Sequence, residues 1–566
     1  MPGLLEQVNL NGNGLNNVEE DGPAQPAELP VLIVGGGPTG LLSAYMLSKF
    51  GIKSLLIEKY PERLAAPKAH ALCPRSLEIC RQYGLDTNAM RKLGAPREDA
   101  NRVNFVTNLS GEHIGLLPYE RMDSGVLEHT PEMLHNIPQP AFEQFVAKEL
   151  EHDPNVEIRK NVAYVTSRQV FISTLEERST KTQWQANLRP VVGERTGMLH
   201  WITDPACSGF IIAYDLEANH VLISNFDSKK HPADTWSQEL AQTTVAAAIG
   251  QEVPFEVLSY RPWLLSRKVA NHYRQGNIFL VGDAAHSFPP TGGLGLNSGI
   301  ADAHNLAYKI AAVHHGWATP SILQTYEDDR RQIALVNSAQ SVKNGKKIFS
   351  FLKTLGTAGI DDVEEARRNL HKSIHDPKKQ DMIANEVEGQ REHFDNLGLH
   401  IGYVYGDKET PPHASKFSPK FTPGGRLPHA WIKPRRGAAS FKLAPLDVSY
   451  VKEFHQDGIN ARQFSTLDLL DFDSFTLIVS SRNTWATRFD QLHKLTQSSG
   501  INLRLCSVDE DFEFVFEEQQ DTYNKGSGIL QGGGLLVRPD QHLLGCVDEK
   551  ATAEDLALLV LAHLGK

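Results

Sequence analysis

The chain of 566 residues is poor in cysteine: it has five, and no two of them form a Cys-x-x-Cys pair. This scarcity excludes a disulfide framework and a thiolate zinc site, and it is typical of a protein from a reducing compartment. The sequence also lacks any run of about 18 apolar residues, which a membrane-spanning helix requires. Its first residues lack the basic stretch and apolar core of a secretory signal. We therefore expect a cytoplasmic protein without a membrane span.

Positive charge is scarce as well, since the formal net charge is -11. A general nucleic-acid binder needs a basic surface to meet phosphates, so we expect no nucleic-acid partner. The remaining composition, 40% hydrophobic and 22% charged residues, is that of a globular protein with ample material for buried cores. The length predicts about three or four domains.

A βαβ unit is predicted near the start of the chain. Residues 31–34 form an apolar run typical of a parallel strand buried on both faces. A glycine-rich turn, a helix over about 40–50 and a second strand ending at Glu58 follow it.

The glycine turn of this unit fits G-x-G-x-x-G at Gly35, Gly37 and Gly40. The first glycine permits the tight turn, the second lets the backbone approach a pyrophosphate, and the third allows close helix–strand packing. Glu58, 18 residues beyond Gly40, can accept hydrogen bonds from ribose hydroxyls. The pattern predicts dinucleotide binding, and its alternative is a purely structural glycine-rich turn.

A second glycine-rich stretch, NIFLVGDAAHSFPPTGGLGLNSGI, begins at residue 277. Asp283, at the predicted carboxyl end of an apolar strand, suits a polyol chain. The following helix, which we expect to begin near Leu296 and Asn297, would aim its positive end at a bound ring. The small and ring-shaped residues between them would let bare backbone approach a flat ring; they are Pro289, Pro290, Gly292, Gly293 and Gly295.

Together these stretches resemble the class A flavoprotein monooxygenases, the family of para-hydroxybenzoate hydroxylase and phenol hydroxylase. In that family the Gly-Asp pair, here Gly282–Asp283, places the aspartate on the ribityl chain of FAD, and the loop that follows runs along the isoalloxazine ring. Smaller matches imply that Arg75 and Gln139 approach the cofactor. Trp263 is a candidate for the substrate cavity, with a core position as the alternative.

The resemblance implies a reaction as well as a cofactor. NADPH or NADH would reduce FAD, O2 would add to give a C4a-hydroperoxide, and an oxygen atom would pass to a phenolic or other aromatic small molecule. No covalent protein nucleophile is needed, and His70, His286 and Tyr214 remain open as candidates for a base. Two alternatives are an epoxidase or Baeyer–Villiger type of oxygenase on the same fold, and a non-catalytic nucleotide-binding protein.

The segments FTPGGRLPHAWI and GGGLLVRPDQHLLGCV resemble the phenol hydroxylase and dichlorophenol hydroxylase branch, in which a thioredoxin-like domain is appended. That domain cannot be redox-active here because it has no Cys-x-x-Cys, so its expected role is packing, with a homodimer as one outcome. The leader and the appended domain are compatible with secondary metabolism or phenol degradation.

The resulting fold prediction is an α/β protein in which a doubly wound FAD-binding domain, of the glutathione-reductase type, is interleaved with a β-rich substrate domain. We expect the following divisions: a disordered leader over 1–28, the FAD-binding domain over 29–190 and 265–345, the substrate-binding sheet over 191–264, a helical segment and linker over 346–440, and the thioredoxin-like domain over 441–566.

One joint, KTQWQANLRPVVGE at residues 181–194, departs from the family pattern. In the family a strand here ends in Asp-Gly, in a segment of the type YLVGADGAKSRVR, and fills the sheet beside the first strand. That Asp-Gly is implicated in nicotinamide cofactor use. No Asp-Gly occurs between residues 160 and 270, so a few tens of residues are missing.

Losing a buried strand would open the sheet and leave ladder groups unpaired, at about 1–3 kcal/mol each. Three interpretations stay open: a skipped exon or gene-model error, a variant in which another segment fills the place, or a pseudoenzyme. We expect the chain as written to bind FAD poorly or to be insoluble.

Overall fold

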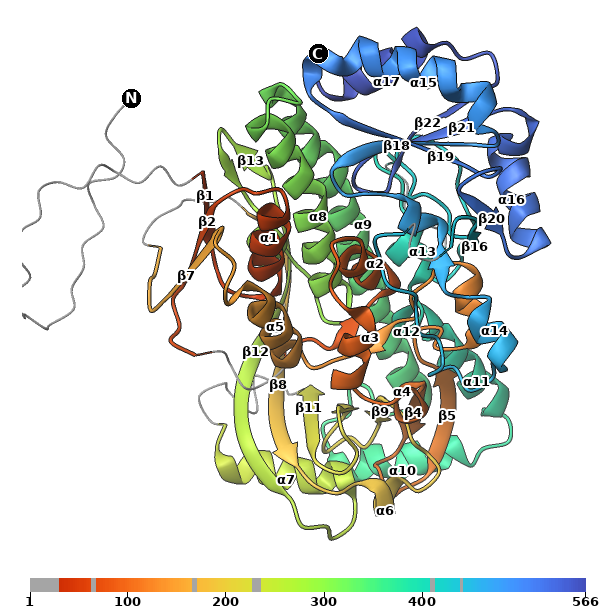
Figure 1. The fold of residues 1–566 in the computed structure, drawn as a ribbon. Helices are drawn as coiled ribbons and strands as arrows, with labels where there is room; N and C mark the ends of the chain where they lie inside the picture. Colours follow the sequence, from red (N-terminus) through yellow and green to blue (C-terminus); the bar gives the residue numbers. More distant parts are fainter. Residues whose placement is uncertain (1–29, 63–67, 165–170, 226–235, 408–412, 438–440) are drawn as a thin grey trace, which may run out of the picture.

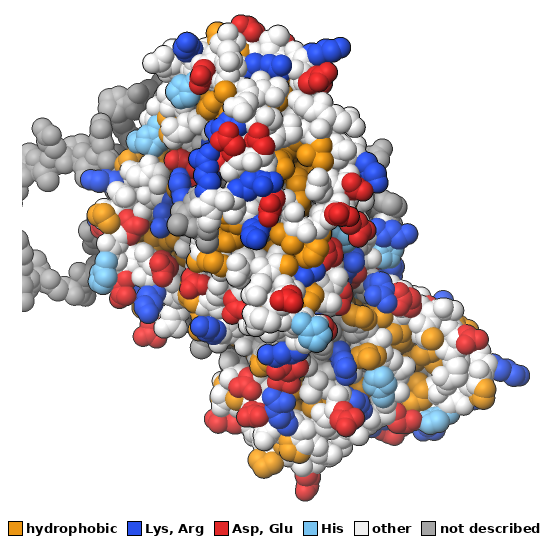
Figure 2. Space-filling view, turned by 45° about the vertical axis from the view of Figure 1, so that its right-hand side comes forward, with side chains coloured by type: hydrophobic (Ala, Val, Ile, Leu, Met, Phe, Trp, Pro, Cys, Tyr) orange, Lys and Arg blue, Asp and Glu red, His pale blue; other side chains and the backbone are white. Residues whose placement is uncertain are grey.

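The computed structural model describes residues 30–62, 68–164, 171–225, 236–407, 413–437 and 441–566 (Figure 1). The predicted disordered leader over 1–28 lies outside these ranges. Within them, no helix combines the length and the apolar character that crossing a membrane would need. Positive and negative side chains are interspersed over the face shown in Figure 2, without a continuous basic area there.

The first layer is a small parallel sheet, which the predicted βαβ unit begins. Its order is β1-β2-β7, formed by Val31–Val34, Ser54–Glu58 and Val156–Lys160. Helices α1 (Pro38–Lys49) and α5 (Gln139–Leu150) pack together beside this sheet, and α1 also packs on α8 (Leu294–His314). The doubly wound FAD-binding half of the fold prediction is thereby present, with α1 and α8 starting within two residues of the expected positions.

The prediction that the first strand is buried on both faces is wrong. β1 is the end strand of its sheet, and Leu32 and Val34 are 52% and 54% exposed. The apolar strand expected at 277–283 is also reduced to the two residues of β14 (Ile278–Phe279), which pair with β13 (Arg274–Gln275). Among the described residues, β1 pairs only with β2 and β14 only with β13, so each of these strands has one edge without ladder hydrogen bonds.

An eight-stranded sheet forms the second layer, and its long curved strands β8 and β12 are seen at the lower left of Figure 1. It draws strands from beyond the expected 191–264 range, because β4 and β5 pair beside β9, and β8 pairs with both β11 and β12. We therefore propose a substrate domain that includes these segments. In sheet order the strands are β15 (His286–Ser287), β12 (Glu256–Ala270), β8 (Phe171–Gln185), β11 (Asn219–Asn225), β10 (Gly209–Ala213), β9 (Leu199–Ile202), β4 (Arg102–Val106) and β5 (His113–Pro118).

Helices cover the sheets and lead to the third part of the chain. Residues 320–400 are mostly helical. The helices there are α9 (Thr325–Leu355), α10 (Val363–Ile374), α11 (Gln380–Gly389), α12 (Arg391–Phe394) and α13 (Leu397–Ile401). Elsewhere the shorter elements are α2 (Pro74–Gln82), α3 (Thr87–Met90), α4 (Arg97–Ala100), α6 (Arg189–Val192), α7 (Gln238–Ile249), α14 (Gln456–Asn460), β3 (Ala71–Leu72) and β6 (His135–Asn136).

The C-terminal part, drawn in blue in Figure 1, is built on a four-stranded sheet of order β19-β18-β21-β22. β18 pairs parallel to β19 and antiparallel to β21, and β21 pairs antiparallel to β22. Along the chain, the strands of this sheet and the helices between them follow the order β, α, β, α, β, β, α. Its thioredoxin-like identity stays a prediction. The elements are β18 (Ser474–Val479), α15 (Arg482–Thr496), β19 (Asn502–Ser507), α16 (Glu517–Ser527), β21 (Gly534–Val537), β22 (Leu543–Val547) and α17 (Ala553–His563), with a small sheet of β16 (Trp431–Pro434), β17 (Phe464–Ser465) and β20 (Phe512–Phe514) beside it.

Candidate functional site

A cavity of about 1120 Å³ lies between the small parallel sheet, the start of α8 and one face of the eight-stranded sheet. It brings together most of the residues that the sequence nominated, although they come from segments some 250 positions apart in the chain. Those that line it are Gly35, Gly37, Gly40, Gln139, Asp283, Pro289, Pro290, Gly292, Gly293, Gly295 and Leu296.

The G-x-G-x-x-G turn has the geometry that its spacing predicts. Gly35 has φ of +108°, and a Cβ on Gly40 would lie 2.0 Å from the Gly35 carbonyl oxygen, so only glycine permits this close approach of helix and turn. The Gly36 N–H donates to Glu58 Oε2 at 2.7 Å. Glu58 therefore stands beside the turn, at the end of β2, although it is not on the cavity wall.

The Gly-Asp turn packs directly against this first motif. A Cβ on Gly282 would lie 2.8 Å from Thr39 Oγ1 of α1, and Gly282 also has φ of +57°. Its N–H donates to Asp302 Oδ2 at 3.2 Å, which fixes the turn. Asp283 follows in a 3-10 turn, exposed into the cavity, as a ligand for a polyol would be.

The two helix N-termini at the cavity also fit FAD, because their first N–H groups are uncapped. α1 begins after Gly37 and α8 begins after Gly293, and neither has a side-chain cap or an acidic residue in its first turn. The first N–H groups of a helix lack partners within the helix and carry partial positive charge. Both helices can therefore meet the negative groups of a dinucleotide.

Two of the predicted cofactor residues lie elsewhere. Arg75 is buried away from the cavity, where its guanidinium donates to Glu78 Oε2 at 3.2 Å and to Gln541 Oε1 at 2.5 Å. Asn297 bonds within the protein: its Oδ1 accepts from the Cys73 N–H at 2.9 Å, and its Nδ2 donates to the Gly293 carbonyl at 2.9 Å. These polar side chains hold the fold together because burial obliges them to find protein partners.

The next candidates are Trp263, predicted for the substrate cavity, and two of the three proposed bases, Tyr214 and His286. Trp263 lies on β12, but its side chain is outside the described residues. Tyr214 is buried and does not line the cavity. His286 is also buried, and its Nε2 contacts Asp302 Oδ2 at 2.8 Å. It therefore positions the carboxylate that holds the Gly282 turn, and it does not face a substrate.

His70 does line the cavity, with its Nδ1 2.9 Å from Asn136 Oδ1. Its ring stacks with Tyr119 at a centroid distance of 6.4 Å and meets Tyr214 edge-on at 5.5 Å. Burial lowers the pKa of His70 to about 4, against the opposing hydrogen bond to Asn136. The ring is thus neutral near pH 7, and of the three proposed bases it is the one at the cavity wall.

Sequence reasoning missed the acid at this end of the cavity, Glu120. Burial raises the pKa of Glu120 to about 8, and the nearby Asp395 adds to this, so the carboxyl is largely protonated at neutral pH. Asn396 Nδ2 donates to Glu120 Oε1 at 3.5 Å and to the Gly292 carbonyl at 3.4 Å, which links the acid to the predicted flavin loop. No local motif marks Glu120, so only the fold could reveal it.

A further part of the cavity wall is apolar and aromatic. Its side chains come from one face of the eight-stranded sheet and from α12. The side chains are Leu199, Trp201, Phe210, Ile212, Ile223 and Phe394.

The same cavity continues along the open edge of β1. Its wall there includes Leu32 and Val34 on one side and Ile278 and Phe279 of β14 on the other. Ile278 is 59% exposed, which is similar to the exposure of Leu32 and Val34, so apolar side chains of both strands are left uncovered. Among the described residues, β1 thus has one unpaired edge. The joint predicted at 181–194 does not adjoin this edge, because residues 181–185 continue β8 and pair with both β11 and β12.

The site thus has the features of a flavoprotein. Residues 28–172 and 166–341 match the protein family described as FAD binding domain. Phenol 2-monooxygenase of Pseudomonas sp. (strain EST1001) is 24% identical, with 94% of this chain and 92% of that protein aligned. A putative polyketide hydroxylase of Streptomyces halstedii is 24% identical over 93% and 95% of the two chains.

Among solved structures, the flavin-dependent monooxygenase PieE in complex with FAD and substrate superimposes with a TM-score of 0.79 at 21% identity, covering 95% of this chain and 100% of that one. The chain belongs to the FAD-binding family of class A aromatic hydroxylases. The predicted family and the predicted cofactor FAD are confirmed, and the protein is an FAD-dependent monooxygenase by that membership.

Proposed function

We propose that this protein hydroxylates a phenolic small molecule, with FAD as bound cofactor, NADPH or NADH as reductant and O2 as the source of the oxygen atom. The observation that carries the proposal is that one cavity joins both glycine-rich turns to an apolar, aromatic wall. A flat cofactor and a flat substrate would lie in contact there. Reduced FAD supplies the oxygen-activating chemistry in such enzymes.

The residues of the chain have separable roles in this proposal. The turn from Gly35 to Gly40 and Asp283 would hold the cofactor. Trp201, Phe210 and Phe394 would orient an aromatic ring and keep water away from it, which raises the yield of oxygen transfer. Glu120 would hold a proton next to the substrate, while His70 is available as a neutral hydrogen-bonding partner of a phenol.

The names of the relatives favour phenols and polyketides as the substrate class in this proposal. Three cations line the cavity, Lys68, Lys181 and Arg261. Burial, with Lys68 and Arg261 nearby, lowers the pKa of Lys181 to about 7. Excess positive charge of this kind suits the phosphates of a nicotinamide cofactor. The choice between NADPH and NADH, the cytoplasmic location and the homodimer stay predictions.

Incubation with 18O2, NADPH or NADH and a panel of phenols tests the proposal. We expect ring-hydroxylated products that carry one labelled oxygen atom, because the oxygen source is O2. A labelled lactone or an epoxide-derived diol would favour the alternative oxygenases instead. A bound-flavin spectrum without substrate-dependent oxidation of NADPH or NADH would favour a non-catalytic nucleotide-binding protein.

We expect Asp283→Asn to weaken FAD binding by about tenfold or more, since a hydrogen bond to a charged group contributes roughly 1.5–3 kcal/mol. Titration of the protein with FAD, followed by quenching of flavin fluorescence, measures this over a wide range of affinity. The matched control is Asp490→Asn, which removes an equal charge from the exposed surface of α15. Equal affinities for both variants would exclude Asp283 from the cofactor site.

A further inference from the structure

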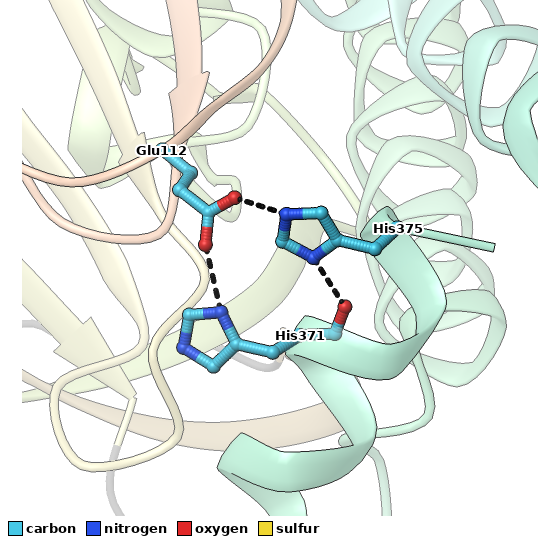
Figure 3. Close-up of side chains that lie close together, drawn as sticks. All are labelled: Glu112, His371 and His375. Carbon is cyan, nitrogen blue, oxygen red and sulfur yellow. Dashed lines mark hydrogen bonds and ion pairs between the residues drawn. The ribbon is translucent and has the colours of Figure 1, made fainter.

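A second cluster of ligand-type side chains lies on the surface, where the turn between β4 and β5 meets α10 (Figure 3). Glu112 comes from the turn, His371 from the last part of α10, and His375 directly follows that helix. His371 Nδ1 lies 2.8 Å from Glu112 Oε1, and His375 Nε2 lies 2.9 Å from Glu112 Oε2. None of the three lines the flavin cavity.

The hydrogen-bond roles of His375 do not balance for a neutral ring. Its Nδ1 lies 2.8 Å from the His371 carbonyl oxygen, while its Nε2 faces a Glu112 carboxylate oxygen. Both partners are acceptors, whereas a neutral imidazole has one N–H to donate. A neutral ring that keeps its N–H on Nδ1, toward the His371 carbonyl, leaves Nε2 free to bind a cation held between it and Glu112.

The rest of the geometry is what a metal ligand needs. In metal sites the ring nitrogen that does not bind the ion commonly donates to a backbone carbonyl, which is the role that Nδ1 of His375 has. His371 and His375 are four apart, so α-helical spacing places both on one face. Ligand atoms held about 2.0–2.2 Å from a tetrahedral zinc lie roughly 3.3–3.6 Å from one another, so the two Glu112 contacts, at 2.8 and 2.9 Å, would lengthen to admit the ion.

We propose that Glu112, His371 and His375 bind a divalent transition-metal ion, with Zn²⁺ as the expected occupant and water completing the site. Two imidazoles and one carboxylate favour Zn²⁺, Co²⁺, Ni²⁺ or Cu²⁺ over Mg²⁺ and Ca²⁺, which prefer oxygen ligands throughout. The ion would fasten α10 to the β4–β5 turn. Arg367 already ties α10 to the substrate domain through Asp204, at 2.9 and 3.1 Å, so the metal would add a second fixed point.

The test is calorimetric titration of the chelator-treated full chain with Zn²⁺, together with thermal unfolding with and without the ion. We expect one Zn²⁺ per chain and a higher melting temperature with Zn²⁺ than with EDTA. His371→Ala, His375→Asn and Glu112→Gln should each weaken Zn²⁺ binding by about tenfold or more, since each removes one ligand. All three side chains are partly exposed, so these variants should fold.

His272→Ala is the matched control, because His272 is an exposed histidine that faces a single carboxylate, Glu327, at 3.3 Å. It should leave Zn²⁺ binding unchanged. The proposal is overturned if the unaltered chain binds Zn²⁺ no more tightly than the His371→Ala variant, or if Zn²⁺ and EDTA give the same melting temperature. Either result would mean that side-chain contacts alone hold the cluster together, without a metal ion.

Discussion

Insertion of a strand that ends in Asp-Gly, at residues 166–172 where the two stretches matched to the FAD-binding family meet, is expected to tighten FAD binding by about a hundredfold or more relative to the chain as written. The reason is that β1 has one edge without a ladder partner among the described residues, and that Leu32, Val34 and Ile278 are exposed. A hundredfold change corresponds to about 2.8 kcal/mol. Two or three satisfied backbone groups, at about 1–3 kcal/mol each, would supply it.

The inserted segment can be taken from the corresponding part of the Pseudomonas phenol 2-monooxygenase, since that protein aligns over most of both chains. FAD bound per purified chain and the dissociation constant from flavin fluorescence are the measurements. A Gly/Ser insertion of equal length at the same position is the control for chain length. If the chain as written purifies yellow, with near-stoichiometric FAD that NADPH bleaches, the expectation is wrong.

Comparing the chain as written with the inserted form also separates a failure to bind FAD from a failure of the proposed function. A chain that hydroxylates phenols only after insertion keeps the proposal and assigns the loss to the missing strand. A chain that fails in both forms, although the inserted form binds FAD, contradicts the proposal itself.

The largest effect on stability is expected for Glu78→Gln, which should lower the free energy of unfolding by about 3–5 kcal/mol. Glu78 is buried on α2, and its carboxylate accepts from Arg426 at 2.6 and 2.8 Å, from Arg75 at 3.2 Å and from Thr130 at 2.6 Å. The neutral amide would leave two buried guanidinium groups without their counter-charge. These contacts also join α2 to the segment before the C-terminal part, so the loss affects how two parts of the chain pack.

Denaturant unfolding of both chains at pH 7 measures this loss. Glu453→Gln is the control, because Glu453 is exposed and its pair with Arg97, at 2.6 Å, should contribute no more than about 1 kcal/mol. If the two variants lose similar free energies of unfolding, the buried Glu78 cluster contributes no more to stability than an exposed ion pair.

The same carboxylate predicts a pH dependence. Burial would raise the pKa of Glu78, but Arg426, Arg75 and the Thr130 hydroxyl outweigh it and lower the pKa from 4.5 to about 2. A group whose pKa falls on folding contributes stability above its unfolded pKa and loses it as the pH drops. The unaltered chain should therefore lose its advantage over Glu78→Gln progressively between about pH 4.5 and pH 2, and a constant difference across this range would contradict the assignment.

The parts of the site that could be predicted are those in which backbone geometry ties function to local sequence. Gly35 has a positive φ, a Cβ on Gly40 would collide with the Gly35 carbonyl oxygen, and Gly282 combines a positive φ with close contact to Thr39. The constraints at Gly35 and Gly40 involve residues only a few positions apart, so the spacing of the glycines in the sequence predicts them. Arg75 and Asn297 are the opposite case: a polar side chain near a motif can turn to cofactor or to protein, and here both bond to protein.

The sequence by itself determined the family, the cofactor, the two glycine-rich turns and the absence of the Asp-Gly strand, because each is written in contiguous residues. Only the tertiary structure decided that Glu120 and Asn396 adjoin the flavin loop, and that Glu112 meets two histidines some 260 residues later. It also decided that the apolar strand Val31–Val34 ends as an exposed edge. The physical reason is that burial, pKa and ligand geometry depend on neighbours that packing brings together from distant parts of the chain.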